Sequence, residues 1–183
     1  CLWVAGAWVA TSLIQAQAQT VVVQQQNFND AAVESQIGNT PPAGWTVKTF
    51  YSDGSAGDVK VTSGPAEWLG WKFVTPNTWT TKKTTAGNRG EFTKASGGIA
   101  LIESDGLRAD KNYNSSLIAP KVAVSASNSY VLTFDTHYRK GQSPQSADVT
   151  VTFDKGAAVT RPFTVDTLNT LSTVEFTPPA GAT

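Results

Sequence analysis

The segments Tyr130–Tyr138 (YVLTFDTHY) and Ala147–Asp154 (ADVTVTFD) decide the fold class, because both alternate apolar and polar residues. Successive side chains of a strand point to opposite faces. One face of the first segment therefore carries Tyr130, Leu132, Phe134, Thr136 and Tyr138. The inward face of the second carries Val149, Val151 and Phe153. The alternation predicts two strands, and the turn-forming residues 141–144 between them predict that they form an antiparallel pair.

Similar β-branched and aromatic runs, bounded by turn residues, recur along the chain. Further strands are expected at residues 20–25, 45–50, 59–62, 71–74, 99–103, 116–119, 158–165 and 171–177. Residues 75–89 are polar and rich in Thr, and we interpret them as a surface loop with one helical turn near Trp79. About nine to eleven short strands without a strong amphipathic helix predict an all-β fold, an antiparallel β-sandwich of the jelly-roll type.

The composition excludes several classes of protein. The 183 residues carry 14 basic and 14 acidic side chains, so nothing indicates nucleic acid or an anionic membrane surface as a partner. The chain has one Cys, at position 1, and one His, at position 137. A thiol nucleophile, a disulfide within the chain after Cys1 and a zinc site built from several Cys or His residues are therefore not expected.

The first eighteen residues are expected to be a secretory signal peptide that lacks its own start. Cys1–Ile14 is uncharged and apolar, and Ala16-Gln17-Ala18 has the small-residue pattern of a cleavage site. The alternative is a membrane anchor, but about fourteen apolar residues are fewer than the roughly 20 that span a bilayer. We therefore expect cleavage after Ala18, a secreted or extracellular protein, and no membrane span.

Residues 19–183 are expected to form a single β-sandwich domain. Its last expected strand is followed directly by Pro178-Pro179 and a short Gly- and Ala-containing end. A sandwich needs its late strands to close the sheets, so we expect this domain to be truncated at its C-terminal end and attached to a downstream domain.

Several short motifs occur in an order that resembles the MAM-like jelly-roll domains, which include cleaved-adhesin and choice-of-anchor modules of secreted bacterial proteins. They are Pro41-Pro42-Ala43-Gly44-Trp45-Thr46, Leu117–Pro120, Leu132–Tyr138 and Val149–Gly156. The resemblance covers residues 28–183. It implies a non-catalytic β-sandwich attached to a secreted hydrolase, a metallophosphoesterase or an adhesin.

Oxygen-rich loops make structural calcium the expected cofactor, since calcium binds carboxylate and amide oxygens. Glu103 and Asp105 stand two residues apart at a strand end, and Asp110 follows in the same loop. Asn29 and Asp30 form a second cluster, where the family resemblance implies an ion ligand. The alternative is that these acidic loops are only solvated.

Aromatic residues suggest a carbohydrate site, because flat rings stack on sugars and polar neighbours bind their hydroxyls. Trp79 is expected to form an exposed platform in a polar loop, flanked by Asn77 and Lys82, with Trp68 as a second platform residue. The partner would be a polysaccharide or a cell-surface glycan. The alternative places these rings in the core or as anchors of loops.

Catalysis is the third hypothesis. Glu103 and Asp105 resemble the paired carboxylates of a jelly-roll glycoside hydrolase, whereas His137 and Asp135 read as an ordinary surface pair because no G-x-S-x-G motif is present. We therefore interpret the chain as a non-catalytic module that binds carbohydrate or mediates adhesion or anchoring. A calcium-stabilised spacer and a glycosidase remain the alternatives.

Overall fold

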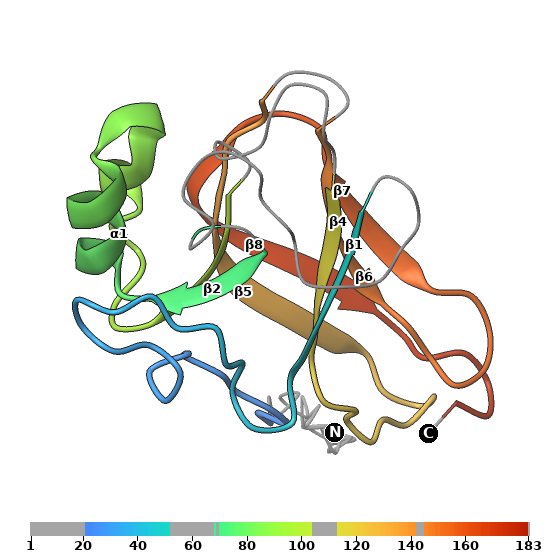
Figure 1. Cartoon of the computed structure of the whole chain (residues 1–183). Helices are drawn as coiled ribbons and strands as arrows, with labels where there is room; N and C mark the ends of the chain where they lie inside the picture. Colours follow the sequence, from blue (N-terminus) through green and yellow to red (C-terminus); the bar gives the residue numbers. More distant parts are fainter. Residues whose placement is uncertain (1–20, 52–67, 69, 104–112, 142–144, 183) are drawn as a thin grey trace, which may run out of the picture.

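The computed structural model describes residues 21–51, 68, 70–103, 113–141 and 145–182, and these residues form mainly strands (Figure 1). The elements are β1 (Thr46–Tyr51), β2 (Trp71–Val74), α1 (Pro76–Lys83), the 3-10 helix η2 (Ala86–Glu91), β3 (Ile99–Ile102), β4 (Tyr113–Ile118), β5 (Tyr130–Tyr138), β6 (Ala147–Val151), β7 (Val159–Phe163) and β8 (Thr167–Phe176). The predicted all-β class is confirmed. No helix in these ranges is long and apolar enough to cross a membrane.

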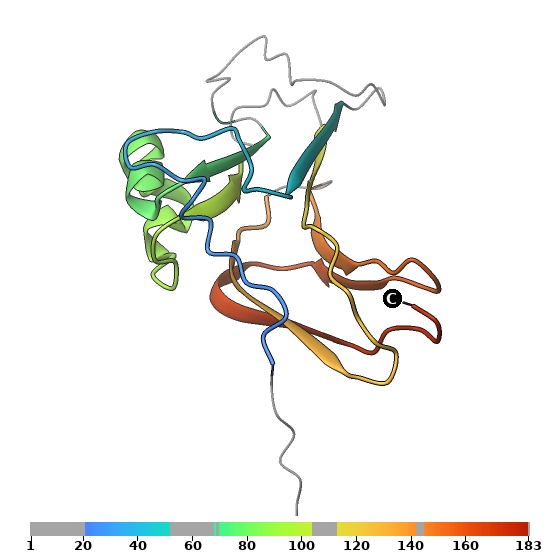
Figure 2. The same cartoon turned by 90° about the horizontal axis from the view of Figure 1, so that it is seen from below.

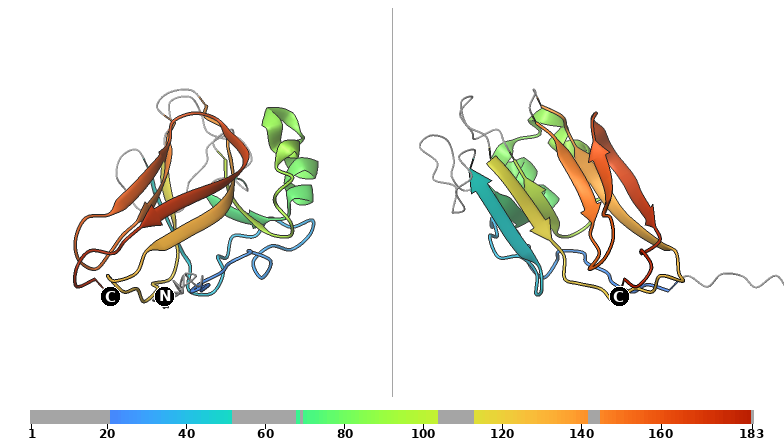
Figure 3. Two further views of the ribbon diagram at one scale, coloured as in Figure 1. Left: turned by 180° about the vertical axis from the view of Figure 1, so that it is seen from behind. Right: turned by 90° about the vertical axis from the view of Figure 1, so that its right-hand side faces the viewer.

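The strands form four antiparallel pairs, β1–β4, β2–β3, β5–β8 and β6–β7. The β1–β4 and β5–β8 pairs lie on opposite sides of the molecule in a sandwich-like arrangement (Figures 2 and 3). The helical segment lies beside β2–β3 at one end, and the β6–β7 hairpin lies at the other end. The expected signal peptide and the strand expected at 59–62 fall outside the described residues.

The predicted pairing of Tyr130–Tyr138 (β5) with Ala147–Asp154 (which contains β6) is wrong. β5 pairs with β8, in a register that places Tyr130 opposite Phe176, and these two rings stack with centroids 5.6 Å apart. β6 pairs instead with β7. Residues 152–158 join these two strands, and Gly156 among them adopts the left-handed conformation (φ 85°). So short a connection favours pairing of the two strands that it joins, which leaves β5 to pair with the long C-terminal strand.

Two other local predictions are also corrected. Residues 21–25 are exposed and form no strand. The expected surface loop contains helix α1, although its Thr-rich sequence has weak helix propensity. Thr75 caps the helix, since its Oγ1 accepts the Thr78 amide proton at 3.1 Å, and Pro76 occupies the first turn.

A buried apolar cluster lies between α1 and the β2–β3 pair. It contains Trp68, Val74, Trp79, Ile99 and Leu101, all buried. A second apolar group lies on the strands at the far end, where buried Phe163 of β7 contacts the rings of Phe134 and Tyr138. The helical segment and the long β5–β8 pair therefore each have their own apolar packing.

Candidate functional site

Glu103, directly after β3, is the centre of a buried charged cluster. Its side chain is only 6% exposed. Oε1 accepts hydrogen bonds from Trp79 Nε1 at 2.6 Å and from Arg89 Nε at 2.8 Å. Oε2 accepts from Arg89 Nη2 at 3.1 Å and lies 3.6 Å from Lys83 Nζ. One carboxylate thus joins α1 and η2 to the end of β3.

Local backbone geometry brings these partners together. Trp79 and Lys83 are four residues apart on α1, so they lie on the same helix face. Within η2 the chain turns sharply at Gly87 (φ 73°) and Asn88 (φ 65°), just before Arg89. The Lys83 ammonium group also lies 5.9 Å from the centroid of the Trp68 ring. The sequence prediction missed this cluster, because the pairing depends on a helix that it had interpreted as a loop with one helical turn near Trp79.

The expected aromatic platform is wrong in its geometry. Trp79 is 6% exposed and Trp68 is 1% exposed. The helix turns Trp79 toward β2–β3, and its indole N–H is used by Glu103. Neither ring has a free face for a sugar to stack on.

The calcium candidates are not brought together in the described part of the chain. Glu103 is occupied by the cationic partners above, and the side-chain Oδ1 of Asn29 accepts the Gly98 amide proton at 2.6 Å. Asp30 is exposed, while Asp105 and Asp110 fall outside the described residues. Among the residues that the structure describes, no group of three or more His, Cys, Asp or Glu side chains could hold a metal ion.

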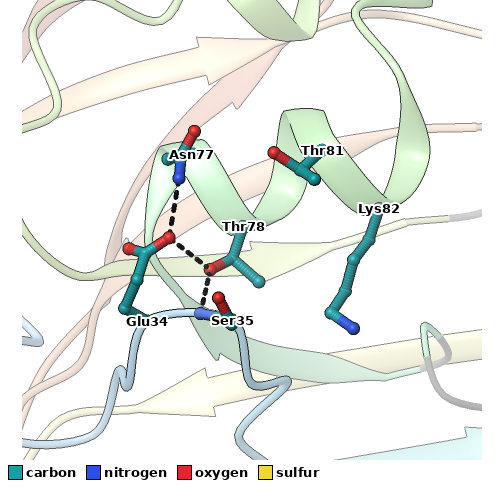
Figure 4. Close-up of a pocket in the computed structure, with 6 residues that line it drawn as sticks. All are labelled: Glu34, Ser35, Asn77, Thr78, Thr81 and Lys82. Atoms are coloured by element: carbon teal, nitrogen blue, oxygen red, sulfur yellow. Dashed lines mark hydrogen bonds between the residues drawn. The ribbon is translucent and has the colours of Figure 1, made fainter.

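A polar pocket of about 160 Å³ lies between α1 and residues 34–35 (Figure 4). It is lined by Glu34, Ser35, Asn77, Thr78, Thr81 and Lys82. Two of the residues predicted to bind a ligand, Asn77 and Lys82, therefore lie in one pocket, on the helix that carries Trp79 inward.

Glu34 fixes the wall of this pocket that faces the helix. Its Oε2 accepts from Thr75 Oγ1 at 2.6 Å and its Oε1 accepts from Asn77 Nδ2 at 2.7 Å. These hydrogen bonds lower the pKa of the Glu34 carboxyl, and the bond from Thr75 has the largest effect. Glu34 was not predicted from sequence, since it is about 40 residues away in the chain from the helix side chains that it binds.

His137 lies outside the polar pocket but in contact with the ring of Trp79. Its ring is half-buried against Phe92, with centroids 5.3 Å apart, and meets Trp79 edge-on at 6.1 Å. Nδ1 accepts the Asn169 backbone N–H at 3.3 Å. Asp135 is exposed. The histidine is thus packed between elements, not paired at the surface as the sequence suggested.

Comparisons of the chain with protein families, with curated proteins and with solved structures find no match.

Proposed function

We propose that this chain is a non-catalytic module of a larger secreted protein, which binds carbohydrate and thereby mediates adhesion or anchoring. The proposal includes a jelly-roll topology of the MAM-like type. The sandwich-like arrangement of the strand pairs supports it. The observation that carries the proposal is the polar pocket on α1, where Asn77 and Lys82 lie opposite Glu34.

The pocket offers the chemistry that a polyhydroxylated ligand requires. Glu34 presents acceptor oxygens, Lys82 presents donors, and Asn77 and Thr81 can do both. Sugar hydroxyl groups also donate and accept, so a pocket lined by mixed polar groups can fix their orientation. Binding here would depend on hydrogen bonds, because the tryptophan of this helix faces inward.

The buried state of Glu103 supports a role without catalysis. A catalytic carboxyl must reach the proton or the carbon on which it acts. The two oxygens of Glu103 are instead engaged by Trp79, Arg89 and Lys83 inside the fold. We therefore assign this carboxylate a structural role.

The experiment is affinity electrophoresis of the purified chain through gels that contain different polysaccharides. At least one polysaccharide should retard the chain, and Lys82→Ala or Asn77→Ala should remove the retardation. Lys121→Ala is the matched control, since Lys121 is also an exposed lysine but lies outside the pocket.

Unretarded migration across a broad panel would rule out the carbohydrate proposal. If millimolar calcium then raised the melting temperature of the same protein, the calcium-stabilised spacer would become the better assignment, because a ligand that binds only the folded state stabilises it.

A further inference from the structure

The single histidine of the chain lies at the one irregular point of the β5–β8 pair. The register of this pair shifts between Thr136 and Tyr138, where residues 168 and 169 of β8 stand opposite His137 alone, so the extra residue lies in β8. An extra residue of this kind bends its strand locally. The His137 ring packs on Phe92, which follows η2, and on Trp79 of α1.

Asn169 connects the same place to the helical segment. Its backbone N–H donates to His137 Nδ1 at 3.3 Å. Its side-chain oxygen accepts from the Lys94 amide at 2.8 Å, and its side-chain nitrogen donates to Thr93 Oγ1 at 2.9 Å. Asn169 itself has a positive φ of 48°, a conformation that costs energy for a residue other than glycine. His137 and Asn169 therefore join residues 92–95 to both strands of the β5–β8 pair.

We propose that His137 is a pH-sensitive latch, which holds the helical layer (α1, η2 and residues 92–95) on the β5–β8 pair while the imidazole is neutral and releases this layer when the ring is protonated. Protonation converts Nδ1 from an acceptor into a donor that faces the Asn169 N–H donor. It also places a positive charge in a half-buried position. Both effects act against the packed state.

The neighbouring charges do not cancel this effect. Burial lowers the pKa of His137, and this outweighs the attraction of Glu91 on η2 and the nearby Asn88 carbonyl, which act in the opposite direction. Arg89 and Lys83 are paired with Glu103. On β5 itself, Asp135 is exposed, and Arg139 extends toward Gly87 of η2.

The direction of the pH dependence follows from the lowered pKa. The folded state prefers the neutral ring. The contribution of His137 to the stability of the folded state is therefore complete above the ordinary pKa of 6.5. It is lost as the pH falls below 6.5 toward the pKa of the folded state. Because α1 also carries the polar pocket, release of the helical layer would disturb that pocket on acidification.

The test uses NMR, since a chain with one histidine has one imidazole signal to follow. Between about pH 7.5 and about pH 5 the ring should titrate below its ordinary pKa. The amide signals of Thr93, Lys94 and Asn169 should move with the same midpoint. Their hydrogen exchange, corrected for the intrinsic effect of pH, should accelerate by up to about tenfold for each unit by which the pKa is lowered.

The variant His137→Asn makes the test specific, because an asparagine oxygen can accept the Asn169 N–H but does not titrate in this range. The acid-dependent loss of melting temperature should disappear in this variant and persist in the control Asp135→Asn. An equal loss in the parent and in His137→Asn would overturn the proposal. Should His137→Asn not fold, titration of the unmodified ring without any shift of the three amides would overturn it equally.

Discussion

At the scale of single residues, Glu103 shows how a buried charge can stabilise this small fold. Moving a carboxylate out of water is costly, and partners of opposite charge must compensate for the lost hydration. Arg89 supplies two hydrogen bonds, Lys83 a further positive charge, and the Trp79 indole a neutral donor. Removal of the carboxylate charge would take this negative partner from two cationic side chains that are only 10% and 14% exposed.

Glu103→Gln should therefore lower the free energy of unfolding by about 3–5 kcal/mol, the usual cost of breaking a buried ion pair by removing one partner. Urea denaturation followed by tryptophan fluorescence measures this loss. Glu175→Gln is the control, because Glu175 is exposed on β8 and its change should stay within about 0.5 kcal/mol. Equal effects of the two substitutions would contradict a structural role for the Glu103 charge.

Trp79→Phe separates the structural role of this residue from a role in binding. The substitution keeps an aromatic ring in the core but removes the N–H that donates to Glu103. We expect a loss of about 1–3 kcal/mol in the free energy of unfolding, since a buried acceptor loses one donor. Retardation in polysaccharide gels should be unchanged. A folded variant that no longer binds would mean that the Trp79 ring contacts the ligand after all.

At the scale of elements, helix α1 depends on its cap more than on its composition. Thr75→Ala removes the bond to the Thr78 amide and the bond to Glu34, and should cost about 0.5–2 kcal/mol in unfolding free energy. Thr85→Ala is a matched control, because Thr85 precedes η2 without a capping hydrogen bond from its side chain. Urea denaturation of the two variants measures the difference, and a loss no larger than the control's would show that the cap is unimportant.

Glu34 should make the attachment of this helix sensitive to strong acid. Because the folded state lowers its pKa below the ordinary 4.5, its contribution is present above 4.5 and is lost as the pH falls through the folded value. Glu34→Gln should thus melt at a lower temperature than the parent at pH 6 and lose less on further acidification. Melting curves at several pH values test this, with Glu175→Gln as the control that should keep the parent's acid response.

The same elements show what the sequence alone can predict. Strands β2, β5 and the centres of β1 and β3 were located correctly, because alternation and β-branched residues are local signals. The partner of β5 was wrong, since β8 lies about 30 residues farther along and only packing of rings such as Tyr130 and Phe176 selects it. Helix α1 was predicted only as one helical turn near Trp79, although Thr75-Pro76 is a recognisable start for a longer helix.

The candidate site was predicted only in part, for a related reason. Asn77 and Lys82 were chosen as polar neighbours of Trp79, and they do share a pocket. The tryptophan itself was misplaced, because a helix sends residues 77 and 79 to different sides, whereas a loop does not impose this separation. Glu34 and His137 act through contacts that are distant in sequence, and no local pattern indicates such contacts.

At the scale of the whole molecule, two apolar groups, one around α1 and β2–β3 and one on the strands at the other end, are joined by a small contact region. Trp68, Val74 and Trp79 belong to the cluster around α1 and β2–β3, whereas Phe163 belongs to the strands at the other end. His137 and Asn169 lie where the helical segment reaches β5 and β8. A contact region with few buried contacts allows one group to open before the other.

Native-state hydrogen exchange at low urea concentrations should therefore resolve two cooperative units. Amides of α1, β2 and β3 should share one opening free energy, and those of β5 and β8 should share a higher one. The difference is expected because β2 and β3 pair over four residues each, whereas β5 and β8 form a far longer ladder. The difference between the two opening free energies should increase in acid for the parent but not for His137→Asn, since protonation weakens only the contact between the helical segment and the β5–β8 pair. A single opening free energy for all of these amides would mean that the helical segment and the long strand pair unfold as one unit.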